Sequence, residues 1–158
     1  MKHSFQIISL LFFMIFTTFS FSEEGRLVFD LGMDESGLEK IYIQSPSVQS
    51  FPPDEEFGMS HTKTIRLPSI VIGLHQGEKG FYVWRLDITG SGWAFHHPSI
   101  FIGAAESELE KHIGIPESKE VEDGVTHYFF RLYPQDSWVK ISVKEGRVTK
   151  IFAAEDWT

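Results

Sequence analysis

The chain has 158 residues, no cysteine and a formal net charge of −8. The lack of cysteine excludes disulfides and the lipid-bearing cysteine of bacterial lipoproteins, so the fold has to rest on its hydrophobic core alone. The acidic balance argues against nucleic acid as a partner, because a phosphate backbone repels a chain of the same sign.

Residues 1–22 have the pattern of a secretory signal peptide. A cationic start precedes an apolar run from Ile7 to Phe21, and the small residues Ser20 and Ser22 fit a cleavage site. We predict cleavage after Ser22, which places the mature chain outside the cytoplasm, in the periplasm or in the medium. The alternative is a membrane anchor, but a bilayer core needs roughly 20 apolar residues and this run offers about 15.

Two segments of the chain that lie 71 positions apart read alike. The matching residues are Gly32, Glu35, Ser36, Leu38, Glu39 and Lys40 in the first copy and Gly103, Glu106, Ser107, Leu109, Glu110 and Lys111 in the second. A proline follows each copy, at Pro46 and Pro116. We interpret this match as an internal duplication, with a first unit over residues 23–92 and a second unit over residues 93–158.

Each unit is predicted to begin with a short helix. Asp34 stands at an N-cap position before the first helix, which Gly37 weakens. In the second unit, Leu109 and its neighbours four residues away form an apolar stripe, and Gly114 ends the helix. The proline-rich and acidic segment from Gln44 to His61 predicts a long exposed loop.

The segments after the helices have the composition of β-strands bounded by turns. In chain order, the predicted strands are Thr62–Leu67, Ser69–Leu74, Phe81–Thr89, Thr126–Tyr133, Ser137–Val143 and Arg147–Ala153. The last strand breaks the alternation of apolar residues, which predicts a bulge there. We therefore expect an α+β protein of two tandem repeats, each a helix plus a three-stranded antiparallel meander, with the helices packed on one face of the sheet.

The second unit resembles a known pattern. Its features are Ile102-Gly103 before the helix, Gly114-Ile115-Pro116 after it, Tyr128 in the next strand, and Glu145-Gly146-Arg147-Val148 before the last strand. It looks like the β-lactamase inhibitor proteins and the outer-membrane assembly lipoproteins called SmpA, OmlA or BamE. The resemblance implies a tandem module that acts through protein contacts and catalyses nothing. It implies no particular target, because those inhibitors carry disulfides and those lipoproteins a lipid-bearing cysteine.

No motif in the chain indicates catalysis, a cofactor or a metal site. The pair His96-His97 is the main hint of metal ligands, but neighbouring residues on a strand point to opposite faces. No Gly-x-Ser-x-Gly elbow is present, and the acidic clusters 54–56 and 117–123 lack the spacing of a calcium loop. We interpret the histidines as surface or turn residues and the acidic clusters as solvated loops.

Aromatic side chains are the strongest candidates for a binding surface, because Trp and Tyr are frequent interface anchors. The candidate partner-binding residues are Tyr82, Trp84, Trp93, Phe95, Trp138 and Lys140. Trp138 alternates with the apolar residues of its strand and shares a face with Lys140, so it should point away from the helices. For each ring, packing in the core is the alternative.

These observations favour an exported, non-catalytic module that binds another extracytoplasmic protein through an open sheet face, as an inhibitor or as an assembly partner. It would have neither a lipid anchor nor a cofactor. The second hypothesis is a structural or scaffolding component of the cell envelope.

Overall fold

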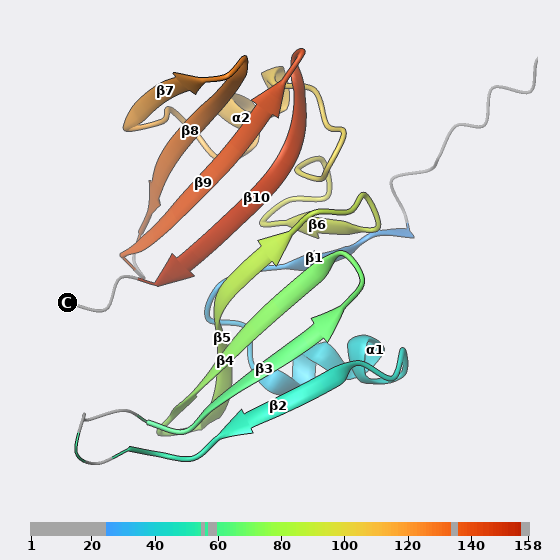
Figure 1. The fold of residues 1–158 in the computed structure, drawn as a ribbon, viewed down its shortest axis with the longest axis vertical. Helices are drawn as coiled ribbons and strands as arrows, with labels where there is room; N and C mark the ends of the chain where they lie inside the picture. Colours follow the sequence, from blue (N-terminus) through green and yellow to red (C-terminus); the bar gives the residue numbers. More distant parts are fainter. Residues whose placement is uncertain (1–24, 55, 57–59, 134–135, 156–158) are drawn as a thin grey trace, which may run out of the picture.

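The computed structural model describes residues 25–54, 56, 60–133 and 136–155 (Figure 1). The predicted signal peptide, residues 1–22, lies outside the described residues. None of the described helices has the length and apolar character needed to cross a membrane.

The described part of the chain forms an eight-stranded antiparallel sheet, called here the main sheet, in the order β2-β3-β4-β5-β10-β9-β8-β7 (Figure 1). Its strands are β2 (Ser47–Phe51), β3 (Thr62–Leu67), β4 (Ile70–Gly77), β5 (Gly80–Ile88), β7 (Ser118–Glu122), β8 (Val125–Leu132), β9 (Ser137–Lys144) and β10 (Arg147–Glu155). The two halves of the sheet meet at the centre, where β5 pairs with β10. Strands β2 and β7 form the edges.

The remaining elements are short. A small parallel sheet pairs β1 (Leu27–Phe29) with β6 (Trp93–Phe95). The 3₁₀ helix η2 (Glu35–Leu38) continues into α1 (Glu39–Tyr42), and α2 spans Ser107–His112.

The predicted fold class is wrong. The described residues are 54% strand and 12% helical, and they build a single eight-stranded sheet, not two repeats of a helix with a three-stranded meander. Both helical segments are short. The first ends at Tyr42, shortly before Ser45, at φ +53°, and Pro46, while Gly114, at φ +112°, and Pro116 stop the second. Four of the described strands were also missed. β2 lies inside the predicted loop 44–61 and β7 inside the acidic cluster 117–123, and the short strands β1 and β6 were not predicted either.

The strand predictions were more successful. All six predicted strands are present as β3, β4, β5, β8, β9 and β10, with ends shifted by a few residues. The bulge predicted in the last strand is confirmed, because the pairing of β10 with β9 shifts between Val148 and Lys150. The predicted boundary between units falls directly before β6.

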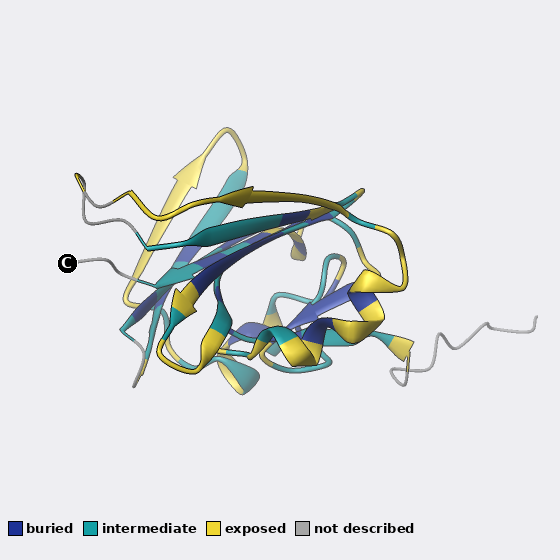
Figure 2. Cartoon of the chain, turned by 90° about the horizontal axis from the view of Figure 1, so that it is seen from below, coloured by how far each residue is buried: buried dark blue, intermediate teal, exposed yellow. Residues whose placement is uncertain are grey.

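The core lies between one face of the main sheet and the short elements. Phe130, Val139, Ala153, Leu86, Ile72 and Ile65 stand opposite one another across six neighbouring strands and are all buried. They belong to one apolar cluster with Leu38 and Ile41 of the first helical segment, Leu109 of α2, and Phe29 and Phe95 of the small sheet. The helices and the small sheet therefore cover the same face, as Figure 2 shows.

Candidate functional site

The opposite face of the main sheet has no described element packed on it (Figure 2). Two rows of side chains cross it, because residues paired across strands point to the same side. The first row is Arg131, Trp138, Ala154, Arg85, Gly73 and Thr64, and the second is Phe129, Lys140, Phe152, Asp87, Val71 and Arg66. We call these two rows, together with Trp84, the open face.

Trp84 joins the open face because of a bulge in β5. Gly73 of β4 pairs with Arg85 and the next residue, Leu74, pairs with Val83, so Trp84 is the extra residue. A bulge places two consecutive side chains on one side of a strand. This explains why alternation alone leaves the direction of Trp84 open.

Cationic side chains on the open face lie over aromatic rings. The guanidinium carbon of Arg131 is 4.7 Å from the centre of the Trp138 ring, and that of Arg85 is 5.2 Å from the Phe152 ring. The Lys140 ammonium is 5.4 Å from the Phe129 ring. Such contacts stabilise by about 0.5–1 kcal/mol each at exposed sites, so these long side chains are partly ordered before any partner arrives.

A small hollow of about 150 Å³ lies in the open face at Gly73. Its lining is Thr64, Arg66, Val71, Gly73, Trp84, Arg85 and Asp87. A Cβ atom at Gly73 would stand 2.9 Å from Nε1 of Trp84, so only glycine lets the indole lie this close to β4. We call this feature the Gly73 hollow.

The open face is cationic although the chain is acidic. Its rows hold four cations, Arg66, Arg85, Arg131 and Lys140, and one carboxylate, Asp87. Oδ1 of Asp87 lies 3.3 Å from Nζ of Lys150, and Arg131 forms an ion pair with Asp136. No described carboxylate forms an ion pair with Arg66, Arg85 or Lys140.

Tyr82 lies on the same side of the main sheet, near the start of β5. It stands opposite His75, which is two residues beyond Gly73 on β4, and the two rings meet edge to face at 5.6 Å. Burial raises the pKa of the Tyr82 hydroxyl, and so does Glu155, which accepts its hydrogen bond. Burial also raises the pKa of Glu155 and lowers that of His75.

The predicted site residues separate into two groups. Tyr82, Trp84, Trp138 and Lys140 lie on the side of the open face. Trp93 and Phe95 do not, because β6 places them in the core, where they are 9% and 0% exposed. The Trp93 indole donates a hydrogen bond to Oγ of Ser69 at 3.0 Å, and its ring packs against Phe29. Trp93 and Phe95 therefore pack in the core.

Sequence reasoning missed several residues of the open face, notably Arg66, Phe129, Arg131 and Phe152. Alternation in β8 carried a signal, because Tyr128 and Phe130 are buried and Phe129 and Arg131 must then face the other way. For Phe152 the bulge in β10 obscures the alternation. For Arg66, only its position in β3 indicates that it lies on the open face.

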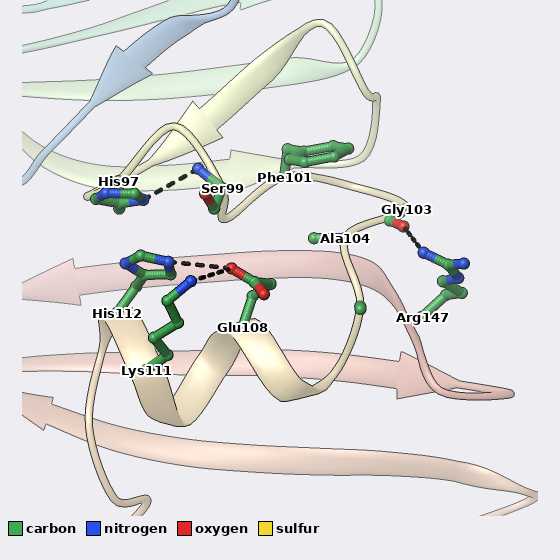
Figure 3. A pocket seen from close by; sticks show the side chains of 10 residues that line it. His97, Ser99, Phe101, Gly103, Ala104, Glu108, Lys111, His112 and Arg147 are labelled. Carbon is green, nitrogen blue, oxygen red and sulfur yellow. Dashed lines mark hydrogen bonds and ion pairs between the residues drawn. The ribbon is translucent and has the colours of Figure 1, made fainter. Parts of the chain in front are cut away.

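A second cavity, of about 460 Å³, lies beside α2 on the covered side of the sheet (Figure 3). The rings of His97 and His112 stack there with their centres 3.7 Å apart. Glu108 accepts a hydrogen bond from Nε2 of His112 at 3.0 Å and lies 3.7 Å from the Lys111 ammonium. The polar side chains named here thus largely pair with one another by hydrogen bonds and ion pairs.

The chemistry of this second cavity does not assemble into a catalytic or metal site. Nδ1 of His97 accepts a hydrogen bond from the backbone N–H of Ser99, so that nitrogen is not aimed at a hydroxyl nucleophile. Within the described ranges, no three His, Cys, Asp or Glu side chains are grouped to hold a metal ion. We therefore take the open face as the candidate functional site.

Comparisons of the chain with protein-family models, with curated proteins and with solved structures gave no match. The site's own geometry is therefore the basis for a functional proposal.

Proposed function

We propose that this protein is a non-catalytic binding module that engages another extracytoplasmic protein through the open face. The observation that carries the proposal is the concentration of Trp84, Trp138, Phe152 and their cationic neighbours on a sheet face that no described element covers. Trp and Arg are among the side chains that most often dominate the binding energy of protein interfaces.

The ordering of the face supports the same proposal. Binding costs free energy when flexible side chains have to be immobilised, at about 0.5–1.5 kcal/mol for each long side chain. Arg85, Arg131 and Lys140 already lie over aromatic rings, so part of this cost is met within the free protein. A face built only for solvation needs no such order.

The decisive experiment is affinity capture with the mature chain as bait, from the extracytoplasmic fraction of its own cells. The test variant is Trp138→Ala, because Trp138 lies near the start of β9 and contacts Arg131. The matched control is Ile43→Ala, which removes an 80% exposed apolar side chain at the end of α1, away from the open face. Circular dichroism and thermal unfolding of each bait establish that the variants fold.

We expect Trp138→Ala to lower the recovery of a specific partner about tenfold or more, as truncation of an interface anchor does. Ile43→Ala should recover the partner within about twofold of the unchanged chain. If the folded Trp138→Ala and Lys140→Ala variants both captured the same proteins in the same amounts as the unchanged chain, the open face would not be the binding surface.

A further inference from the structure

The Gly73 hollow has the size and charge to receive one side chain of a partner. Its volume of about 150 Å³ lies below the range of roughly 300–1,000 Å³ that is usual for sites of whole small molecules. Arg66 on β3 and Arg85 on β5 lie on either side of Gly73, and both are exposed. Gly73 carries no side chain, which lets the Trp84 indole lie against β4 at the hollow.

The electrostatics of the hollow favour an anion. Neither Arg66 nor Arg85 forms an ion pair with a described carboxylate, whereas Asp87, the acid in the lining, lies 3.3 Å from Nζ of Lys150. Arg66 and Arg85 both line the hollow, and the Arg85 guanidinium lies 5.2 Å from the neighbouring Phe152 ring. Guanidinium groups provide planar forks that match a carboxylate. Trp84 forms an apolar wall against which the methylene groups of an acidic side chain can pack.

We propose that the Gly73 hollow binds a glutamate or aspartate side chain from an acidic segment of the protein partner. This inference rests on the proposed function and specifies the chemistry of the partner. An acidic protein segment fits better than nucleic acid, because the chain as a whole carries a net charge of −8 and repels a long polyphosphate. A short acidic segment contacts the cationic face and stays clear of the acidic remainder.

The test is an NMR titration of the mature chain with three probes: hexaglutamate, hexaglutamine and a short DNA duplex. The reporter is the indole N–H resonance of Trp84, which lines the hollow and is assigned by the Trp84→Phe variant. The test variant is the double substitution Arg66→Gln and Arg85→Gln. The matched control is Lys40→Gln with Lys79→Gln, which removes the same charge from exposed sites on α1 and on the β4–β5 turn.

Hexaglutamate should shift the Trp84 resonance in a saturable way, and hexaglutamine at the same concentrations should shift it by less than about a tenth as much. The Arg66 and Arg85 double variant should bind hexaglutamate about tenfold more weakly or worse, since a charge-assisted pair to each arginine is lost. The lysine double variant should stay within about threefold of the unchanged chain, because it alters only distant, screened charges.

Three results would overturn the inference: equal shifts from hexaglutamine, no weakening in the arginine double variant, or tighter binding of the DNA duplex than of hexaglutamate. The last would indicate a polyphosphate site. The proposed function fails separately, when the folded Trp138→Ala and Lys140→Ala variants both leave partner capture unchanged. The two proposals can also be separated. If Trp138→Ala lost the partner but the arginine double variant captured it in full, the open face would be the binding surface and the carboxylate site would be refuted.

Discussion

At the scale of single residues, Gly73 controls the shape of the open face. Because it has no Cβ, the Trp84 ring lies against β4 and Arg85 stands beside it; a Cβ atom at Gly73 would lie only 3.1 Å from Cβ of Arg85. The hollow and the placement of Trp84 thus depend on one hydrogen atom in place of a methyl group.

Gly73→Ala should lower the free energy of unfolding by about 1–3 kcal/mol, the usual cost of forcing extra volume into a packed site. Urea denaturation measures this change. The control is Gly92→Ala, because no atom lies within 4 Å of a Cβ there. Stability equal to that of the unchanged chain would mean that Trp84 moves aside without cost, and its indole resonance would then report the movement.

His75 makes stability depend on pH. Burial lowers its pKa below the ordinary value of 6.5, so the folded chain favours the neutral ring. The unfolded chain binds more protons as the pH falls through about 6.5, and the free energy of unfolding therefore decreases from there down to the folded pKa.

We expect His75→Gln to reduce this loss of stability on acidification. Urea denaturation of both chains between about pH 5 and pH 8 measures it, since that is the window in which histidine titrates. Parallel curves for the two chains would show that His75 makes no contribution.

At the scale of elements, the strands that carry core residues could be predicted from the sequence, and the edges could not. Strands such as β9 alternate buried and less buried residues, and that alternation is visible in the sequence. All residues of β2 and β7 are exposed, so neither strand has a buried apolar face whose alternation would indicate a strand in the sequence. They pair through the backbone with β3 and β8. Missing these two edge strands contributed to the wrong fold class, together with the shortness of the helices and the joining of both halves into one sheet.

The same limit applies to the open face. Trp138 and Lys140 were predictable because β9 is regular, whereas the bulges in β5 and β10 shift the faces of Trp84 and Phe152. Trp93 and Phe95 were misjudged because β6 is three residues long and buried throughout, which leaves no period to read.

The hairpin turns offer a test at this scale. Two-residue turns join β7 to β8 at Asp123-Gly124 and β9 to β10 at Glu145-Gly146, and all four residues have positive φ. Asp tolerates this conformation better than Glu, and Asn better still. A left-handed backbone costs an ordinary residue about 1–2 kcal/mol, so Glu145→Asn should stabilise the chain by about 0.5–1 kcal/mol.

Thermal and urea unfolding of Glu145→Asn measure the gain, with Asp123→Asn as the control that should change little. A loss of stability in Glu145→Asn would show that the Glu145 side chain makes contacts worth more than the backbone strain.

At the scale of the whole molecule, the pairing of β5 with β10 joins the two halves of the main sheet into one structure. Ile151 of β10 stands between Ile88 and Ile141, and all three are fully buried. The core they belong to extends across both halves of the main sheet. We therefore expect one cooperative unfolding transition.

Ile151→Ala should cost about 2–5 kcal/mol, the range for truncating a buried isoleucine. Both halves should unfold at the same lowered urea concentration, as monitored by ¹⁹F-labelled Trp84 in β5 and Trp138 in β9. Val121→Ala, at a 70% exposed site on β7, is the control and should stay within about 0.5 kcal/mol. Separate midpoints for the two labels would show that the halves unfold independently.

The central position of β10 also determines when the protein can fold. A chain made from its N-terminus lacks the middle of the main sheet until residue 155 has been synthesised, because β10 follows every other described strand. Until then β5 and β9 each present an unpaired edge, and incomplete chains of this kind tend to aggregate. The main sheet can therefore be completed only late in synthesis, and the unpaired edges of β5 and β9 remain accessible to chaperones until then.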